Sequence, residues 1–300
     1  MGSGYWNESS FRSYSSKMNR SVSVDGSLSG HYDVQDMFVA KHIDPMLDPK
    51  NVMRECCDSE DHPHTIPVVL GLDVTGSMGT AGVEVAKKLN PIITNLYKKY
   101  EDIEICVMGI GDLYCDKAPI QISQFESDIR IAEQLDKIYF ERGGGGNAYE
   151  SYTAAWYMGV RHMKLDCWKR GSKGIIITTG DEPLNPYLPR NGRYCGLTDA
   201  TGDSLQADID TRDLYEQASK KFDIYHIAVD DRSTCYSGYK DEIENTFGQV
   251  LPKGHLKRAT LDELAVRIVE CIDDSLAHES NKKVNVAQVE PKNTNGEITW

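Results

Sequence analysis

Three oxygen-bearing side chains alternate along one short segment of the chain. Asp73, Thr75 and Ser77 occupy every second position, and Gly76 and Gly79 lie among them. In an irregular loop this spacing turns one carboxylate and two hydroxyl groups to the same side, and glycine avoids the Cβ clashes of a tight loop. Such hard oxygen donors are the ligands that Mg²⁺ and Mn²⁺ prefer. The segment therefore indicates a divalent-cation loop, although short strings of these residues also form ordinary turns.

The loop follows a run of residues that is typical of a buried strand. From Pro67 to Leu72 every residue is apolar or glycine, and Asp73 is the first carboxylate after them. A strand without polar residues is covered on both faces, as in the parallel sheets of α/β proteins. Ligands in these proteins bind just beyond the carboxyl ends of the strands. We therefore expect Asp73 at such an edge, with further ligands on other loops of the same edge.

Two later loops have residues that can complete a cation site. The first contains Gly143–Gly146 followed by Asn147 and Glu150, and a helical pattern begins behind it. The side-chain carbonyl of Asn147 or the carboxylate of Glu150 can bind a hard cation, whereas a helix cap is the simpler interpretation of Asn147. The second is the segment 175–180, again the pattern of a buried strand, which ends at the carboxylate of Asp181. A lone Asp there usually forms a turn, but this one stands on the third loop of the expected edge.

These motifs resemble the metal-ion-dependent adhesion site of von Willebrand factor A domains, whose first loop reads Asp-x-Ser-x-Ser. The resemblance covers roughly residues 64 to 279, with Thr75 in place of the first Ser. The ligands of Mg²⁺ or Mn²⁺ that it implies are Asp73, Thr75, Ser77, Asn147 and Asp181. The family usually has Thr in its second loop, so Asn147 departs from the pattern and Glu150 is the alternative. In the family, an open position on the metal accepts a carboxylate from a protein partner.

A narrower resemblance extends over three segments. Residues 104–116, the loop with Glu150-Ser151-Tyr152, and the segment 179–182 look like a bacterial and phage group of uncharacterised A-domain proteins. A-domain proteins of the prokaryotic cytosol are often encoded with AAA+ ATPases and act as their adaptors. The resemblance therefore implies an AAA+ ATPase as one class of partner.

Strand and helix patterns alternate through this region. The strand candidates are Pro67–Asp73, Ile103–Ile110, Ile120–Ser123, Gly174–Thr179, Phe222–Val229 and a weaker one near Leu256–Arg258. Apolar residues recur at helical spacing over residues 85–96, across Pro91, and over 261–272. The patterns predict an α/β fold with a doubly wound, mostly parallel six-stranded sheet and helices on both faces. The strand at 120–123 follows its predecessor too closely for a helical crossover, so we expect it to pair antiparallel at an edge.

The remaining regions are less regular. Residues 1–30 are rich in Ser, Gly and Asn with isolated aromatic residues, which indicates a flexible arm or a strap that docks on the domain or a partner. We expect an extended lead-in over 31–64, the A-like domain over 65–279 and a loose tail over 280–300.

Composition narrows the classes of function. The net charge of −13 argues against binding to nucleic acid or an anionic membrane, both of which require clustered Lys and Arg. Eight scattered cysteines without a Cys-x-x-Cys pair are typical of a reducing compartment. No secretion signal and no apolar run near the ~20 residues of a membrane span occur. We therefore expect a cytoplasmic protein.

Two alternatives compete with the metal-dependent interaction module, which would not be an enzyme. Asp73-Val74-Thr75-Gly76-Ser77 and Thr179-Gly180-Asp181 also resemble motifs of haloacid-dehalogenase-like phosphoryl transferases, in which Asp73 would be the nucleophile. That chemistry also needs a nearby lysine and a later pair of carboxylates, and no such string occurs. The second alternative is a metal-independent scaffold, which a missing ligand at Asn147 would favour.

Overall fold

A computed structural model describes residues 4–141 and 147–289 of the 300-residue chain, with side chains of the last helix described as far as Ala277. Its centre is a six-stranded sheet in the order β12-β11-β8-β4-β5-β6. The strands are β4 (Ile66–Asp73), β5 (Ile103–Ile110), β6 (Ile120–Ile122), β8 (Gly174–Gly180), β11 (Phe222–Val229) and β12 (Leu256–Ala259). Every one of these strands lies within a residue or two of a strand that the sequence predicts.

The sheet is parallel except at one edge. β4 lies between β8 and β5 and is parallel to both, and β11 and β12 continue the parallel part. β6 pairs antiparallel with β5, with Met108 opposite Ile122. The prediction of a mostly parallel six-stranded α/β sheet with an antiparallel edge strand is therefore confirmed. The connection between β5 and β6 is too short for a crossover helix, so the chain must turn back beside the strand that it has just left.

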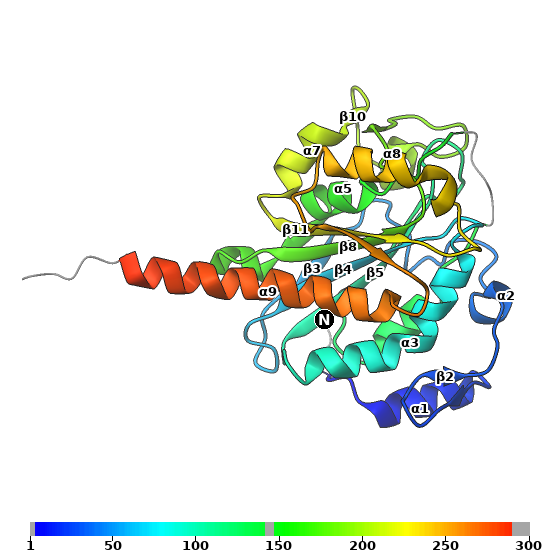
Figure 1. Ribbon diagram of the computed structural model, residues 1–300, viewed down its shortest axis with the longest axis vertical. Coiled ribbons are helices and arrows are strands. Elements are labelled where there is room, and N and C mark those ends of the chain that lie inside the picture. Colours follow the sequence, from blue (N-terminus) through cyan, green and yellow to red (C-terminus); the bar gives the residue numbers. More distant parts are fainter. Residues whose placement is uncertain (1–3, 142–146, 290–300) are drawn as a thin grey trace, which may run out of the picture.

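Helices cover both faces of the sheet (Figure 1). Along β4, Val68, Leu70 and Leu72 belong to one hydrophobic cluster and Val69 belongs to the other, because successive side chains of a strand point to opposite faces. The first cluster packs against α3 (Gly79–Tyr97), α4 (Arg130–Leu135) and α9 (Leu264–Val289). The second packs against α5 (Ala154–Arg161), α7 (Thr211–Ala218) and α8 (Tyr236–Gly248). α3 continues through Pro91 without ending.

The amino-terminal segment differs from the flexible arm expected for residues 1–30, over the residues that the structure describes. It forms α1 (Glu8–Lys17) and a hairpin of β1 (Ser21–Val22) and β2 (Leu28–Ser29). Trp6 and Phe11 are buried in the core cluster below α3, and the indole of Trp6 donates a hydrogen bond to Asn90 Oδ1 at 2.9 Å. Arg20 pairs with the largely buried Asp136 at 2.8 Å. These contacts make the segment a docked strap, which composition alone does not reveal.

The lead-in and the connections carry short elements. The lead-in is not wholly extended, because it contains a helical turn and a strand that pairs parallel with a short strand after α5. The remaining elements are α2 (Val34–Met37), β3 (Arg54–Cys56), β7 (Met163–Leu165), the 3₁₀ helix η1 (Asp166–Arg170), β9 (Tyr187–Leu188), α6 (Leu197–Thr201) and β10 (Ile209–Asp210).

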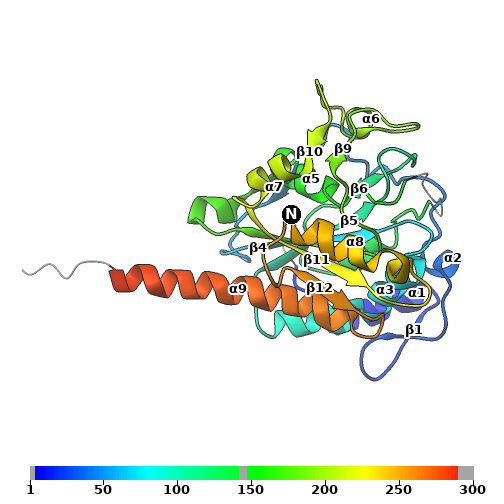
Figure 2. The same cartoon turned by 45° about the horizontal axis from the view of Figure 1, so that its top comes forward.

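The last helix is longer than expected. α9 continues to Val289, and Figures 1 and 2 both show its final turns extending beyond the sheet. The loose tail predicted from residue 280 is therefore wrong over 280–289, where no Gly or Pro interrupts a helix that has already begun. None of the helices in the described ranges is both long and apolar enough to cross a membrane.

Candidate metal centre

The two predicted carboxylates lie at neighbouring strand ends. Asp73 is the last residue of β4, and Asp181 directly follows β8. These strands pair in parallel, with Leu72 opposite Thr179, so the two loops leave the same edge side by side. Asp73 and Asp181 are 1% and 0% exposed, which places both carboxylates out of contact with bulk water. The sheet therefore brings together two residues that are more than a hundred positions apart.

Hydroxyl groups of the first loop bind these carboxylates. Asp73 Oδ1 accepts hydrogen bonds from the backbone N–H of Thr75 at 2.9 Å and from Thr75 Oγ1 at 2.5 Å. Ser77 Oγ donates to Asp181 Oδ1 at 3.2 Å, and the backbone N–H of Cys235 donates to Asp181 Oδ2 at 2.6 Å. The four predicted donor groups of the first and third loops thus form two hydrogen-bonded pairs, and the charge of Asp181 acts on Asp73, so the pairs form one cluster of side chains.

The second loop brings Glu150 toward this cluster. Gly143–Gly146 lie outside the described residues, and Asn147, which is half-buried, contacts the hydroxyl of Tyr149. Glu150 is 3% exposed, and its Oε2 atom is buried without a hydrogen-bond partner. Burial, followed by the charge of Asp73, raises the pKa of Glu150 well above its usual range. A buried carboxylate oxygen without a partner is costly, and a cation is one group that satisfies it.

Tyr152 is a site residue that the sequence reasoning missed. Its hydroxyl donates to Asp73 Oδ2 at 2.8 Å and accepts from the backbone N–H of Glu182 at 3.3 Å, so it joins the first and third loops. A Cβ added to Gly180 would lie 2.1 Å from this hydroxyl, so Tyr152 occupies space that only glycine leaves free. Its ring packs on His226 with centroids 4.7 Å apart. In the sequence, a tyrosine near a helix start carries no signal that separates this role from core packing.

The site has a strongly anionic and poorly hydrated environment. Burial and then the charge of Asp181 raise the pKa of Asp73, and burial raises the pKa of Asp181 itself. Burial and then Asp181 raise the pKa of Glu182 to about 7, and burial raises the pKa of Asp116 to about 6. All four shifts have the same direction, because desolvation and like charges both disfavour the ionised form. A bound divalent cation reverses this balance, since it attracts every one of these carboxylates.

The donor set fits a hard cation in its chemistry. Two carboxylates, two hydroxyl groups and the unpartnered oxygen of Glu150 are all oxygen donors, as Mg²⁺ and Mn²⁺ require. Within residues 4–141 and 147–277, however, no three Asp, Glu, His or Cys side chains already converge as a ligand cluster. Two of the predicted donors are the hydroxyl groups of Thr75 and Ser77. A cluster defined by Asp, Glu, His and Cys does not include these groups.

Comparisons with known proteins find remote structural matches only. No family model and no curated protein matches the chain. Two structures of the pilus adhesin SpaC from Lactobacillus rhamnosus GG align with 75% of this chain at 13% and 12% identity, each with a TM-score of 0.46. The proximal thread matrix protein 1 from the mussel byssus aligns with 72% of it at 10% identity and a TM-score of 0.44. The chain spans 31% of the adhesin and 48% of the matrix protein.

Proposed function

We propose that this chain is a von Willebrand factor A-like domain that holds Mg²⁺ or Mn²⁺ at the carboxyl edge of its sheet and uses the cation to bind a carboxylate of a protein partner. The observation that carries the proposal is the meeting of Asp73 and Asp181, each buried and each hydrogen-bonded to first-loop or backbone donors. Two desolvated acids at one sheet edge are difficult to account for without a positive charge between them.

Asp73, Thr75, Ser77 and Asp181 would hold the cation, and Glu150 would supply the ligand of the second loop in place of Asn147. The support for Glu150 is its unpartnered oxygen and the effect of Asp73 on its pKa. When bound, the cation supplies a Lewis-acidic position that attracts an anionic oxygen. The chain's own groups fix the carboxylates: Thr75 and Tyr152 hold Asp73, and Ser77 and the 235 backbone hold Asp181.

The module would act as an adaptor and not as an enzyme. The resemblance to A-domain proteins implies an AAA+ ATPase as one class of partner. A metal-dependent pull-down from the source cell tests for this partner. We place the activity in the cytoplasm, because no disulfide joins any of the eight cysteines in the part of the chain that the structure describes. Phosphoryl transfer has less support, since both Asp73 oxygens accept hydrogen bonds in a buried setting, whereas a nucleophile needs an accessible oxygen.

Calorimetric titration with Mg²⁺ and with Mn²⁺ tests the proposal. Wild type should bind one cation saturably, and Asp73→Asn and Asp181→Asn should each abolish binding without unfolding the chain. Asp262→Asn is the matched control, because the Asp262 side chain is 98% exposed and pairs with Lys88 of α3, not with a residue of the site. Absence of binding to wild type, or unchanged binding in the Asp73 variant, would leave a metal-independent scaffold as the better account.

A further inference from the structure

A group of exposed aromatic side chains lies beside the candidate site. Tyr114 is 53% exposed and Tyr194 is 54% exposed, on the loops that follow β5 and β8. Tyr187, 40% exposed on the same connection as Tyr194, contacts Tyr149 of the second loop. Tyrosine is enriched at protein interfaces, because a rigid ring gives much contact area with one polar end. These residues stand out among the few exposed large hydrophobic side chains of the described chain.

The loops that carry Tyr114 and Tyr194 are fixed to each other and to the site. The backbone N–H of Arg193 donates to the carbonyl of Tyr114 at 2.7 Å. A Cβ on Gly192 would lie 2.1 Å from the carbonyl oxygen of Leu113, so the two backbones touch. The N–H of Leu113 in turn donates to Ser151 Oγ at 3.0 Å, next to Glu150. The aromatic surface is therefore preformed, which lowers the entropy cost of binding.

Two cations flank the ring of Tyr194. Lys117 Nζ lies 5.8 Å from the centre of the Tyr194 ring, and Arg193 Cζ lies 5.2 Å from it. Both residues are exposed, and no ion pair of either occurs within the described residues. The whole chain has a net charge of −13, so its other charges sum to a net −15, and Asp112 and Asp116 lie on the same loop as Lys117. At physiological ionic strength charges more than about 8 Å away are largely screened, so contact with a partner depends on the charges nearest to it.

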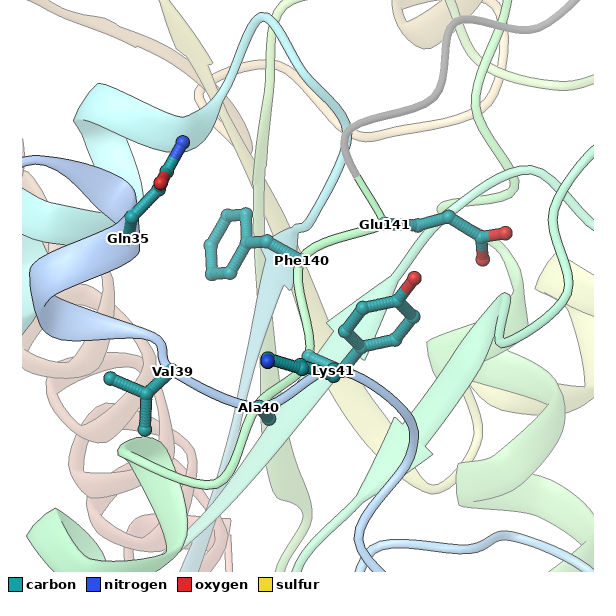
Figure 3. A pocket seen from close by; sticks show the side chains of 7 residues that line it. Gln35, Val39, Ala40, Lys41, Phe140 and Glu141 are labelled. Carbon is teal, nitrogen blue, oxygen red and sulfur yellow. The ribbon is translucent and has the colours of Figure 1, made fainter.

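A pocket of about 450 Å³ adjoins this surface. Glu141 at its rim accepts hydrogen bonds from the backbone N–H groups of Lys117 and Ala118, which ties the pocket to the flanking loop. Figure 3 shows the ammonium group of Lys41 extending into the pocket near Val39, while the carboxylate of Glu141 points away from it. The pocket therefore adds a third cation beside exposed apolar surface, since Val39 is 63% exposed.

We propose that Tyr114, Tyr194, Lys117, Arg193 and the Lys41 pocket form a docking surface for an acidic segment of a protein partner. The inference rests on the proposed function, because the surface borders the cation that would take one carboxylate of that segment. Beyond the carboxylate that binds the cation, the partner segment carries further Asp or Glu side chains. These side chains pair with Lys117 and Arg193 and lie against the tyrosine rings. Charge complementarity of this kind selects the partner and its orientation.

Fluorescence anisotropy with a labelled oligoglutamate peptide tests the surface, with Mg²⁺ and with EDTA. Lys117→Glu/Arg193→Glu should weaken binding on the order of tenfold in both conditions, since two attractive contacts become repulsive. The matched control is Lys220→Glu/Lys253→Glu, which changes the net charge equally. Those lysines are exposed and precede β11 and β12, at the opposite edge of the sheet. The control should change the affinity by less than about twofold.

The variants and the two metal conditions distinguish a failure of the docking surface from a failure of the cation site. One outcome is that Asp73→Asn loses the Mg²⁺-dependent part of the peptide affinity while the Lys117/Arg193 variant binds the peptide as wild type does. This outcome would overturn the docking surface and keep the proposed function. The opposite outcome is that the Lys117/Arg193 variant binds the peptide more weakly, while neither Mg²⁺ nor Asp73→Asn changes the affinity. This outcome would keep the docking surface and overturn the cation-dependent function. Equal weakening by both double variants, or no binding of the peptide to wild type, would overturn the surface proposal.

Discussion

Tyr152→Phe removes one oxygen atom from the candidate site and tests how the site is held together. The Tyr152 hydroxyl donates to Asp73 Oδ2 at 2.8 Å and is fully buried, while burial and then Asp73 raise its pKa well above the usual value. It therefore remains protonated, and remains a donor, at neutral pH. Phenylalanine keeps the ring and its packing against His226, so the substitution isolates the hydrogen bonds.

The size of the effect follows from those contacts. A hydrogen bond to a charged group contributes about 1.5–3 kcal/mol, and tenfold in affinity corresponds to about 1.4 kcal/mol. Without this donor, Asp73 keeps only the hydrogen bonds from Thr75 and is oriented less firmly toward the proposed cation. Loss of a residue that orients a metal ligand typically costs about 10–100-fold in metal affinity. We expect the Mg²⁺ affinity of Tyr152→Phe to fall by about tenfold to a hundredfold by calorimetry, and its unfolding free energy in urea with EDTA to fall by about 1–3 kcal/mol.

Tyr157→Phe is the matched control for this experiment. Tyr157 is also buried and also donates a hydrogen bond to a carboxylate, that of Asp203, away from the site. Its variant should lose comparable stability and keep wild-type Mg²⁺ affinity. The reasoning is refuted if Tyr152→Phe binds Mg²⁺ as wild type does, or if both variants lose affinity equally, which would make the effect one of general stability.

Three further predictions follow from the same contacts. Glu150→Gln should lower Mg²⁺ affinity at least about tenfold and Asn147→Ala less than about threefold, measured by calorimetry; the reverse ranking would return the second-loop ligand to Asn147. Gly180→Ala should destabilise the fold by at least about 2 kcal/mol in urea unfolding, because its Cβ would lie 2.1 Å from the Tyr152 hydroxyl; near-wild-type stability would show that this ring moves easily. Burial lowers the pKa of His226 from 6.5 to about 3, so the folded state binds fewer protons than the unfolded state and stability should fall as pH decreases from 6.5 toward 3. Between pH 6.5 and 5 this group should cost about 2 kcal/mol, a difference that His226→Gln should remove; the same slope in the variant would assign it to other groups.

The positions of the strands were predictable because strands that are buried on both faces consist mainly of apolar residues. β4 is apolar at nearly every position before Asp73 and β8 begins with three isoleucines after Gly174, and the structure buries both strands. The antiparallel pairing of β6 followed from the length of its connection alone. Where residue type gave little indication of burial, the prediction failed. Trp6 and Phe11 lie among Ser, Gly and Asn, and they are buried by contacts with α3 that the local sequence does not show.

The sequence by itself determined which donors leave the sheet edge on the first and third loops. Asp73 and Asp181 end apolar runs, and parallel strands place their carboxyl ends together, so their meeting is a consequence of local pattern and topology. Only the tertiary structure decided what surrounds them. The proposal of Glu150 over Asn147 as a ligand, the bridge that Tyr152 makes from Asp73 to Glu182, and the raised pKa values all depend on burial and on distances between loops. Desolvation and side-chain packing are properties of three-dimensional neighbours, and spacing along the chain does not encode them.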